Sequence, residues 1–158
     1  KVLYPSDEHT EGKLLRLSQQ YFLVSASLQS IISDHIGAYG TLANFADKVA
    51  IHINDTHPAL CVPELMRIFM DIYNYSWESA WEVVRKTISY TNHTVMPEAL
   101  ECWNESLFSF KLPRIHSIIK EINSLKEKKY RQSLVHIPSY PEAEHDGYRR
   151  TWQGYDRR

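Results

Sequence analysis

The sequence has few of the features that would place it in a specialised class of protein. Only two cysteines occur among its 158 residues, Cys61 and Cys102, and neither belongs to a Cys-x-x-Cys pair or to Cys/His metal spacing. A disulfide framework and a zinc site are therefore not expected. We expect the protein in a reducing compartment, the cytoplasm. The first residues contain no apolar signal core, and no apolar run approaches the ~20 residues that cross a bilayer. Secretion and a membrane partner are not expected.

An excess of charge and the common catalytic motifs are also missing. The net charge of -1 gives no electrostatic reason to expect a nucleic acid or an anionic membrane as partner. The sequence contains no glycine-rich phosphate loop, nucleophile elbow or Ser/His/Asp set. What it does contain is an ordinary globular composition, 43% hydrophobic and 23% charged, in a chain long enough to bury a core.

Hydrophobic periodicity predicts several helices. Apolar residues recur at spacings of three and four from Leu14 to Ile32, which predicts a long amphipathic helix that ends by Gly37. Capping residues and prolines predict further helix starts at Pro63, Ser76, Pro97 and Pro113. The last of these helices should end at the charged run 126–129, and the aperiodic tail from 136 to 158 predicts loop structure.

Two short β-rich runs alternate with these helices. Residues 49–53 predict a mostly buried strand, and residues 88–91 predict a second one. Each run is followed by a polar loop containing Asn and His and then by a helix that starts at a proline. This alternation predicts an α/β fold with a parallel sheet, whose ligands collect at the carboxyl ends of the strands.

The polar residues near the first strand end allow two interpretations. His52, Asp55 and His57 could bind a divalent metal, since imidazole and carboxylate groups are common ligands. Alternatively, His52 could pack within the strand while Asp55 hydrogen-bonds its own backbone in a turn. At the second strand end, His93 could face a ligand or be a structural histidine.

The carboxylates and the basic tail also allow alternatives. Glu98 and Glu101 lie three residues apart in a predicted helix and could be compared with a glycosidase acid/base pair. Glycosidase carboxylates face each other across the substrate, whereas these two would point the same way, so complementing the positive helix end is the simpler role. Aromatic and basic residues in the tail could bind RNA, although the segment is short and uneven.

Several stretches of the sequence resemble the glycogen, starch and maltodextrin phosphorylase family. In order they are KVLYPSDEHTEGKLLRLSQQYF, VAIHINDTHPALCVPELMRI, SWESAWEVV and KTISYTNHTVMPEALECW, followed by LPRIHSIIKEIN. The resemblance spans residues 1–123 and implies a helix-rich fragment of the N-terminal lobe of a parallel-sheet, two-lobed, glycosyltransferase-B-like fold. Residues 124–158 are expected to be a divergent tail. The short loop between Gly37 and Asp47 resembles that of bacterial enzymes.

The resemblance implies phosphorolysis of an α-1,4-glucan. In this family orthophosphate releases the terminal glucose as α-glucose 1-phosphate, with retention, assisted by the phosphate group of pyridoxal phosphate. Family members are several times longer than this chain and are usually homodimers. We expect the Schiff-base lysine and most cofactor contacts to lie outside this sequence, so that the chain is inactive without the remaining lobe. The alternatives are a free-standing carbohydrate-binding or regulatory module derived from a phosphorylase, and a metal-dependent hydrolase.

The resemblance also implies roles for individual residues. Asp7 matches the gate loop that controls access to the cleft, although Ser6 and Glu8 replace asparagines that are common there, and Arg16 matches an arginine near the gate. The Asp-Thr-His turn after the first strand matches one that lines the cleft near the acceptor glucan. The histidine and glutamates after the second strand match residues beside the donor glucose.

These matches divide into two groups. The implied catalytic residues are His93 and Asp55. The implied substrate-binding residues are Asp7, Arg16, Asn54, His57, Asn92, Glu98 and Glu101. None of them is implied to be a covalent nucleophile, a cofactor ligand or a metal ligand.

Overall fold

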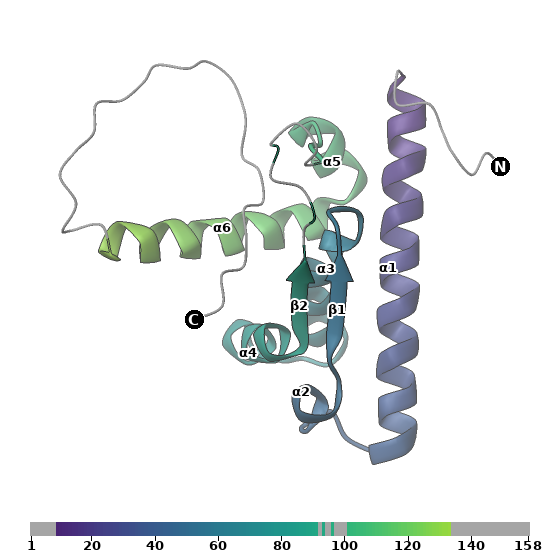
Figure 1. Ribbon diagram of the computed structural model, residues 1–158, viewed down its shortest axis with the longest axis vertical. Coiled ribbons are helices and arrows are strands. Elements are labelled where there is room, and N and C mark those ends of the chain that lie inside the picture. Colours follow the sequence, from purple (N-terminus) through teal and green to yellow (C-terminus); the bar gives the residue numbers. More distant parts are fainter. Residues whose placement is uncertain (1–8, 92, 94–95, 97–100, 134–158) are drawn as a thin grey trace.

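The computed structural model describes residues 9–91, 93, 96 and 101–133, with side chains up to residue 127 within those ranges. Helices surround a small sheet of two parallel strands (Figure 1). In chain order the elements are α1 (Thr10–Tyr39), α2 (Phe45–Lys48), β1 (Ile51–Asn54), the 3₁₀ helix η1 (His57–Leu60), α3 (Cys61–Arg67), the π-helical segment η2 (Ile68–Ile72), α4 (Trp77–Thr87), β2 (Ile88–Thr91), α5 (Glu105–Lys111) and α6 (Pro113–Ser133).

Helix α1 is the predicted amphipathic helix, but it is longer than its sequence suggested. The helix continues through Gly37 to Tyr39, and Gly40 is its C-cap. Gly40 adopts a left-handed φ of 67° and donates its amide to the Ile36 carbonyl at 2.8 Å. The predicted end at Gly37 is therefore wrong. A glycine inside a helix costs only about 1 kcal/mol relative to alanine, and the left-handed cap is at Gly40.

The sheet confirms the predicted parallel pairing. Ile51 lies opposite Ile88, and the register continues to Asn54 opposite Thr91. Strand β1 is less buried than predicted, because Ile53 is buried and Ile51 only partly buried against the core, while His52 and Asn54 are exposed. The prediction of a mostly buried strand is therefore wrong, and the cause is that the core cluster covers one face of the strand.

The helix caps agree with the sequence in part. The Ser76 hydroxyl accepts from the Ser79 amide at 3.2 Å and starts α4 as predicted. Helix α5 was not predicted, although Asn104 caps it by accepting from the Leu107 amide at 3.1 Å. Helix α6 continues past the charged run where it was predicted to end.

Helix α6 also bears on the predicted division of the chain. It runs from Pro113 to Ser133 across position 123, so no break in secondary structure occurs at the predicted boundary between residues 123 and 124. The division into a lobe fragment and a tail of residues 124–158 stays a prediction. The helix expected after Pro97 begins outside the described residues.

Two apolar clusters hold the elements together. The larger one contains residues from α1, β1, α3, η2, α4 and α6: Leu28, Ile53, Leu65, Phe69, Val84 and Ile118 are among them. The smaller one joins α1 to α5 and α6 through Leu17, Phe108, Leu112 and Ile115. In Figure 1, α1 runs over the height of the molecule, and it contacts η1, α3 and α5. None of the described helices is long and apolar enough to span a membrane.

Candidate functional site

The carboxyl ends of β1 and β2 bring two polar loops together. Beyond the last ladder pair, the Asp55 amide donates to the Thr91 carbonyl at 2.9 Å. The ring Nε2 of His93 contacts Oδ1 of Asn54. The loops thus meet at one edge of the sheet, as the parallel strand order predicted.

A tight turn follows β1. Asp55 has a left-handed φ of 70°, a conformation that short polar side chains tolerate better than most. Its carboxylate accepts from the Thr56 amide at 2.6 Å, which fixes the turn. Nearby, burial raises the pKa of Tyr90, and the negative charge of Asp55 raises it further. The Asp55 carboxylate is therefore held in place while nearly half of its side chain stays exposed.

The first turns of α1 face this edge of the sheet. Arg16 approaches the His57 ring, with 3.4 Å between Nη2 and Nε2, and lies 3.3 Å from Oε1 of Glu101 through its Nε. Gln20, one turn further along α1, donates to the same oxygen at 2.9 Å. These contacts join α1 to the turn after β1 and to the segment after β2.

The contacts of His57 assign its tautomer. Because Arg16 can only donate, the ring Nε2 that faces it must be the acceptor. The proton is then on Nδ1, which faces Oδ2 of Asp55 at 3.9 Å. The His57 ring thus lies between a cation and a carboxylate, with just over half of its side chain exposed.

His52 does not have the packing role considered for it. It does not pack in the core but lies exposed, with its Nε2 2.6 Å from the Thr91 hydroxyl. Within the described residues, no three His, Cys, Asp or Glu side chains converge as a metal site would require. The structure therefore offers no support for the metal-dependent hydrolase.

The structure thus joins six of the sequence-predicted site residues through direct contacts in two groups. One group is His93 with Asn54, and the other is Arg16 with His57, Glu101 and Asp55, the last of which faces His57. Three more, Asp7, Asn92 and Glu98, lie outside the described residues. Glu101 itself is not helical, so its predicted place on a helix face is wrong, and its carboxylate turns to α1 instead.

Two participants were missed by sequence reasoning. Gln20 lies four residues after Arg16, and this spacing on one helix face was the available signal. Thr91, the last residue of β2, contacts two residues at the end of β1. Its carbonyl accepts from the Asp55 amide, and its hydroxyl lies against the His52 ring. Nothing in the sequence distinguished it from an ordinary strand residue.

The arrangement suits a neutral, polar ligand. Asn54, His57 and His93 offer both donors and acceptors, and Asp55 offers a fixed carboxylate, which together can match hydroxyl groups that donate and accept. These described groups do not form an activated nucleophile. Binding and orientation of a polyhydroxyl compound is the chemistry that they support.

Comparison with known proteins decides the family. Residues 1–143 match the carbohydrate phosphorylase family. The chain belongs to this family. It is 60% identical to the glycogen phosphorylase of Bacillus subtilis (strain 168) over 123 residues, which is 78% of this chain and 15% of that enzyme.

Other phosphorylases show the same relation. The alpha-glucan phosphorylase 1 of Arabidopsis thaliana is 55% identical over 77% of the chain and 13% of its own length. The glycogen phosphorylase of Haemophilus influenzae aligns with the whole chain at 47% identity, over 19% of its own length. The chain therefore spans less than a fifth of the length of each of these relatives.

Proposed function

We propose that this chain provides one wall of the glucan-binding cleft of an α-1,4-glucan phosphorylase. The observation that carries the proposal is the meeting of polar residues from α1, the turn after β1 and the segment after β2, in a chain of the carbohydrate phosphorylase family. Residues that contact a sugar must come from several segments at once, and these do.

The proposed roles come from the resemblance to the family, and the contacts support them. His93 and Asn54 form a pair that can hold a sugar hydroxyl at the edge of the sheet, and His93 is proposed to contact the donor glucose. Asp55 and His57 face the acceptor side, with Arg16 and Glu101 behind His57. Asp7, Asn92 and Glu98 complete the proposed substrate contacts.

The reaction proposed for the complete enzyme is phosphorolysis. An orthophosphate oxygen forms a bond to the anomeric carbon of the terminal glucose, the glycosidic C–O bond breaks, and a proton passes to the leaving oxygen. The residues of this chain bind and orient the glucan during these steps, and a site fixed in this way lowers the entropic part of the barrier.

Pyridoxal phosphate is proposed to bind elsewhere in the enzyme. Lys86 and Lys120 sit in exposed ion pairs with Glu82 at 3.1 Å and Glu105 at 3.2 Å, which suits a solvated helix face and not a Schiff base. These contacts support the proposal that neither Lys86 nor Lys120 holds the cofactor. We place its lysine and the phosphate contacts in the remaining lobe of a two-lobed, glycosyltransferase-B-like enzyme that acts as a cytoplasmic homodimer.

The test replaces the matching segment of the Bacillus subtilis enzyme with the 123 residues of this chain that align with it. We expect the chimera to release glucose 1-phosphate from a maltooligosaccharide and orthophosphate, and its His93→Ala variant to lose at least about a hundredfold in kcat/KM. The isolated chain should show no turnover. A chimera that folds but is inactive would overturn the proposal, and calorimetric binding of the oligosaccharide to the isolated chain would favour the binding-module alternative.

A further inference from the structure

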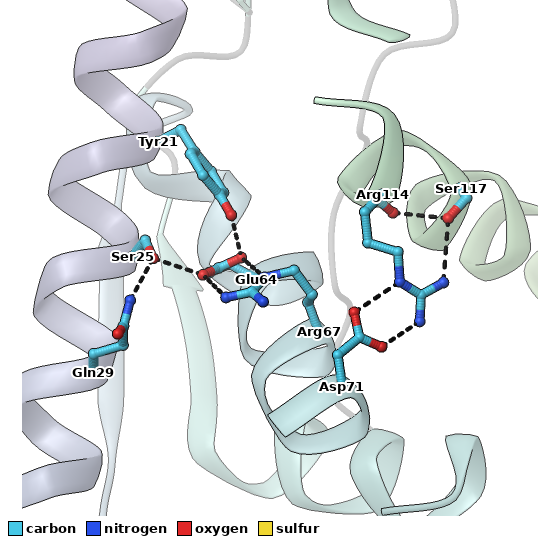
Figure 2. A network of polar contacts seen from close by, with 8 residues as sticks. All are labelled: Tyr21, Ser25, Gln29, Glu64, Arg67, Asp71, Arg114 and Ser117. Carbon is cyan, nitrogen blue, oxygen red and sulfur yellow. Dashed lines mark hydrogen bonds and ion pairs between the residues drawn. The ribbon is translucent and has the colours of Figure 1, made fainter. Parts of the chain in front are cut away.

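A second polar network connects α1 to α3 below the candidate site. Its centre is Glu64, whose side chain is fully buried. The Tyr21 hydroxyl donates to one carboxylate oxygen at 2.9 Å and the Ser25 hydroxyl donates to the other at 2.7 Å. Figure 2 shows both donors reaching from α1 to the carboxylate on α3. A buried carboxylate is costly unless it is hydrogen-bonded, and hydrogen bonds to a charged group are short and directional. The two donors on α1 must therefore stay close to their present positions.

The rest of the network holds the carboxylate from its own helix. Arg67 binds it with two parallel hydrogen bonds, both 2.8 Å long, and its pKa is raised above the ordinary value mainly by these bonds. Gln29 donates to the Ser25 hydroxyl at 2.9 Å and orients it. Burial, followed by the bond to Glu64, raises the pKa of Tyr21, so its hydroxyl remains a donor at neutral pH.

The contacts of Arg16 in the candidate site are longer than those of this network. Arg16 lies 3.4 Å from His57 and 3.3 Å from Glu101, and about a quarter of its side chain is exposed. Both separations are longer than the bonds of 2.7 and 2.9 Å that α1 makes to Glu64. The bonds to Glu64 are therefore the more directional of these contacts of α1.

The two sets of contacts lie on parallel stretches of chain. Along α1, Arg16 is followed by Tyr21 and Ser25; along η1 and α3, His57 is followed by Glu64. A slip of α1 by one residue would move Arg16 about 1.5 Å along the helix axis. Apolar contacts such as that of Leu17 bind α1 to the rest of the protein, but they are not directional. Hydrogen bonds to a fixed carboxylate are directional and oppose movement of α1 along its axis.

We propose that Tyr21 and Ser25 are positioning residues, which act through Glu64 to set the axial position of Arg16 at the turn of residues 55–57. The inference rests on the proposed function, because the turn is proposed to face the acceptor glucan. Misplacement of a binding group by about 1 Å can cost roughly a hundredfold in rate. The network thereby links a buried anchor to the exposed residues that meet the substrate.

The test uses the chimeric phosphorylase and the double variant Tyr21→Phe/Ser25→Ala. These changes remove both bonds from α1 and leave the Glu64–Arg67 pair intact. We expect the KM for maltooligosaccharide to rise about tenfold while the KM for orthophosphate stays within about twofold. In an Arg16→Ala background the same double variant should add less than about twofold, since the residue that it positions is already absent.

The matched control is Asp71→Asn/Arg114→Gln, which removes two bonds between α6 and η2, also drawn in Figure 2. Both double variants should lower the melting temperature, but the control should leave both KM values unchanged. A purely structural role for Tyr21 and Ser25 predicts that the two variants behave alike, and that result would overturn the proposal.

A readout without catalysis separates this inference from the proposed function. Hydrogen exchange of the Thr56 amide, which donates to Asp55, should accelerate at least about threefold in Tyr21→Phe/Ser25→Ala and not in the control. Unchanged exchange would contradict the positioning role even if the parent chimera proves inactive. If the parent chimera is inactive but the Thr56 amide exchanges faster in Tyr21→Phe/Ser25→Ala, the proposed function is contradicted and the positioning role is supported.

Discussion

Two arginine–carboxylate pairs in this chain share one geometry but differ in their surroundings. Arg67 binds Glu64 and Arg114 binds Asp71, each through two hydrogen bonds of 2.6–2.8 Å (Figure 2). The Glu64 side chain is 0% exposed, whereas Asp71 and Arg114 are 33% and 51% exposed. Geometry alone therefore does not rank the two pairs, and burial decides which one the fold depends on.

The difference also concerns what each pair connects. Asp71 on η2 and Arg114 on α6 make their two bonds to each other in water. Glu64 also accepts from two donors on α1, so its pair organises three side chains around one carboxylate. Removing Asp71 leaves a solvated arginine, while removing Glu64 leaves three partly buried donors without their acceptor.

The largest contrast is expected in the chemistry of Cys61, which lies on α3 beside Glu64. Burial, and secondly the charge of Glu64, raise the pKa of this thiol to about 12. The thiolate fraction at pH 8 should then be roughly a thousandfold lower than in the unfolded chain, whose thiols have a pKa of about 8.5. Iodoacetamide labelling with and without urea, read by mass spectrometry, measures this. Equal labelling in both states would mean that water reaches the Glu64 region.

The next effect concerns stability. Glu64→Ala should lower the free energy of unfolding by about 3 kcal/mol, because the change leaves Arg67, Tyr21 and Ser25 without their acceptor. The value is at the low end for a broken buried pair because Arg67 is 21% exposed and can reach water. Urea titration followed by circular dichroism checks it. A loss below about 1 kcal/mol would place Glu64 in the same class as Asp71.

Asp71→Asn should have a smaller effect, below about 1 kcal/mol at pH 7. The hydrogen bonds from Arg114 hold the pKa of Asp71 below its ordinary value, so the stabilisation is present above the unfolded-state pKa and is lost as pH falls through the folded-state pKa. The difference between wild type and variant should therefore shrink as pH falls below about 4. A difference that grows in acid would contradict the assigned pKa direction.

Salt should have the smallest effect on stability, and this effect should differ between the Glu64–Arg67 and Asp71–Arg114 pairs. Raising ionic strength from about 0.1 M to about 1 M shortens the screening length from about 10 Å to about 3 Å. The cost of Asp71→Asn should fall by a few tenths of a kcal/mol, while that of Glu64→Ala should stay unchanged, since water and ions do not reach the buried carboxylate. Parallel urea titrations at both salt concentrations provide the measurement.

Sequence reasoning performed best where a local rule applies. The alternation of strands and helices predicted parallel pairing, and parallel pairing brings Asn54 and His93 to the same edge of the sheet. The cap at Ser76 followed from the hydrogen-bonding needs of a helix start. The end of α1 was misjudged because two glycines, Gly37 and Gly40, satisfy the same stop signal and only the observed φ of Gly40 separates them.

Reasoning from the sequence failed where the partner is remote along the chain. Glu64 follows Pro63 near a helix start, where a carboxylate is ordinarily an exposed complement to the helix dipole. Its burial depends on Tyr21 and Ser25, which lie 43 and 39 residues earlier. Gln20 and Glu101 are 81 residues apart, and no local pattern connects them.

The sequence by itself determined the family, the α/β alternation and the kinds of polar side chain that come after each strand. These properties depend on motifs and on backbone periodicity, which are local along the chain. Only the tertiary structure decided that α1 reaches both Glu101 and Glu64, and that the first of these side chains is partly exposed while the second is fully buried. Hydrogen bonds between remote segments depend on how helices pack, because their geometry is satisfied only when the two backbones come to a particular separation and axial position.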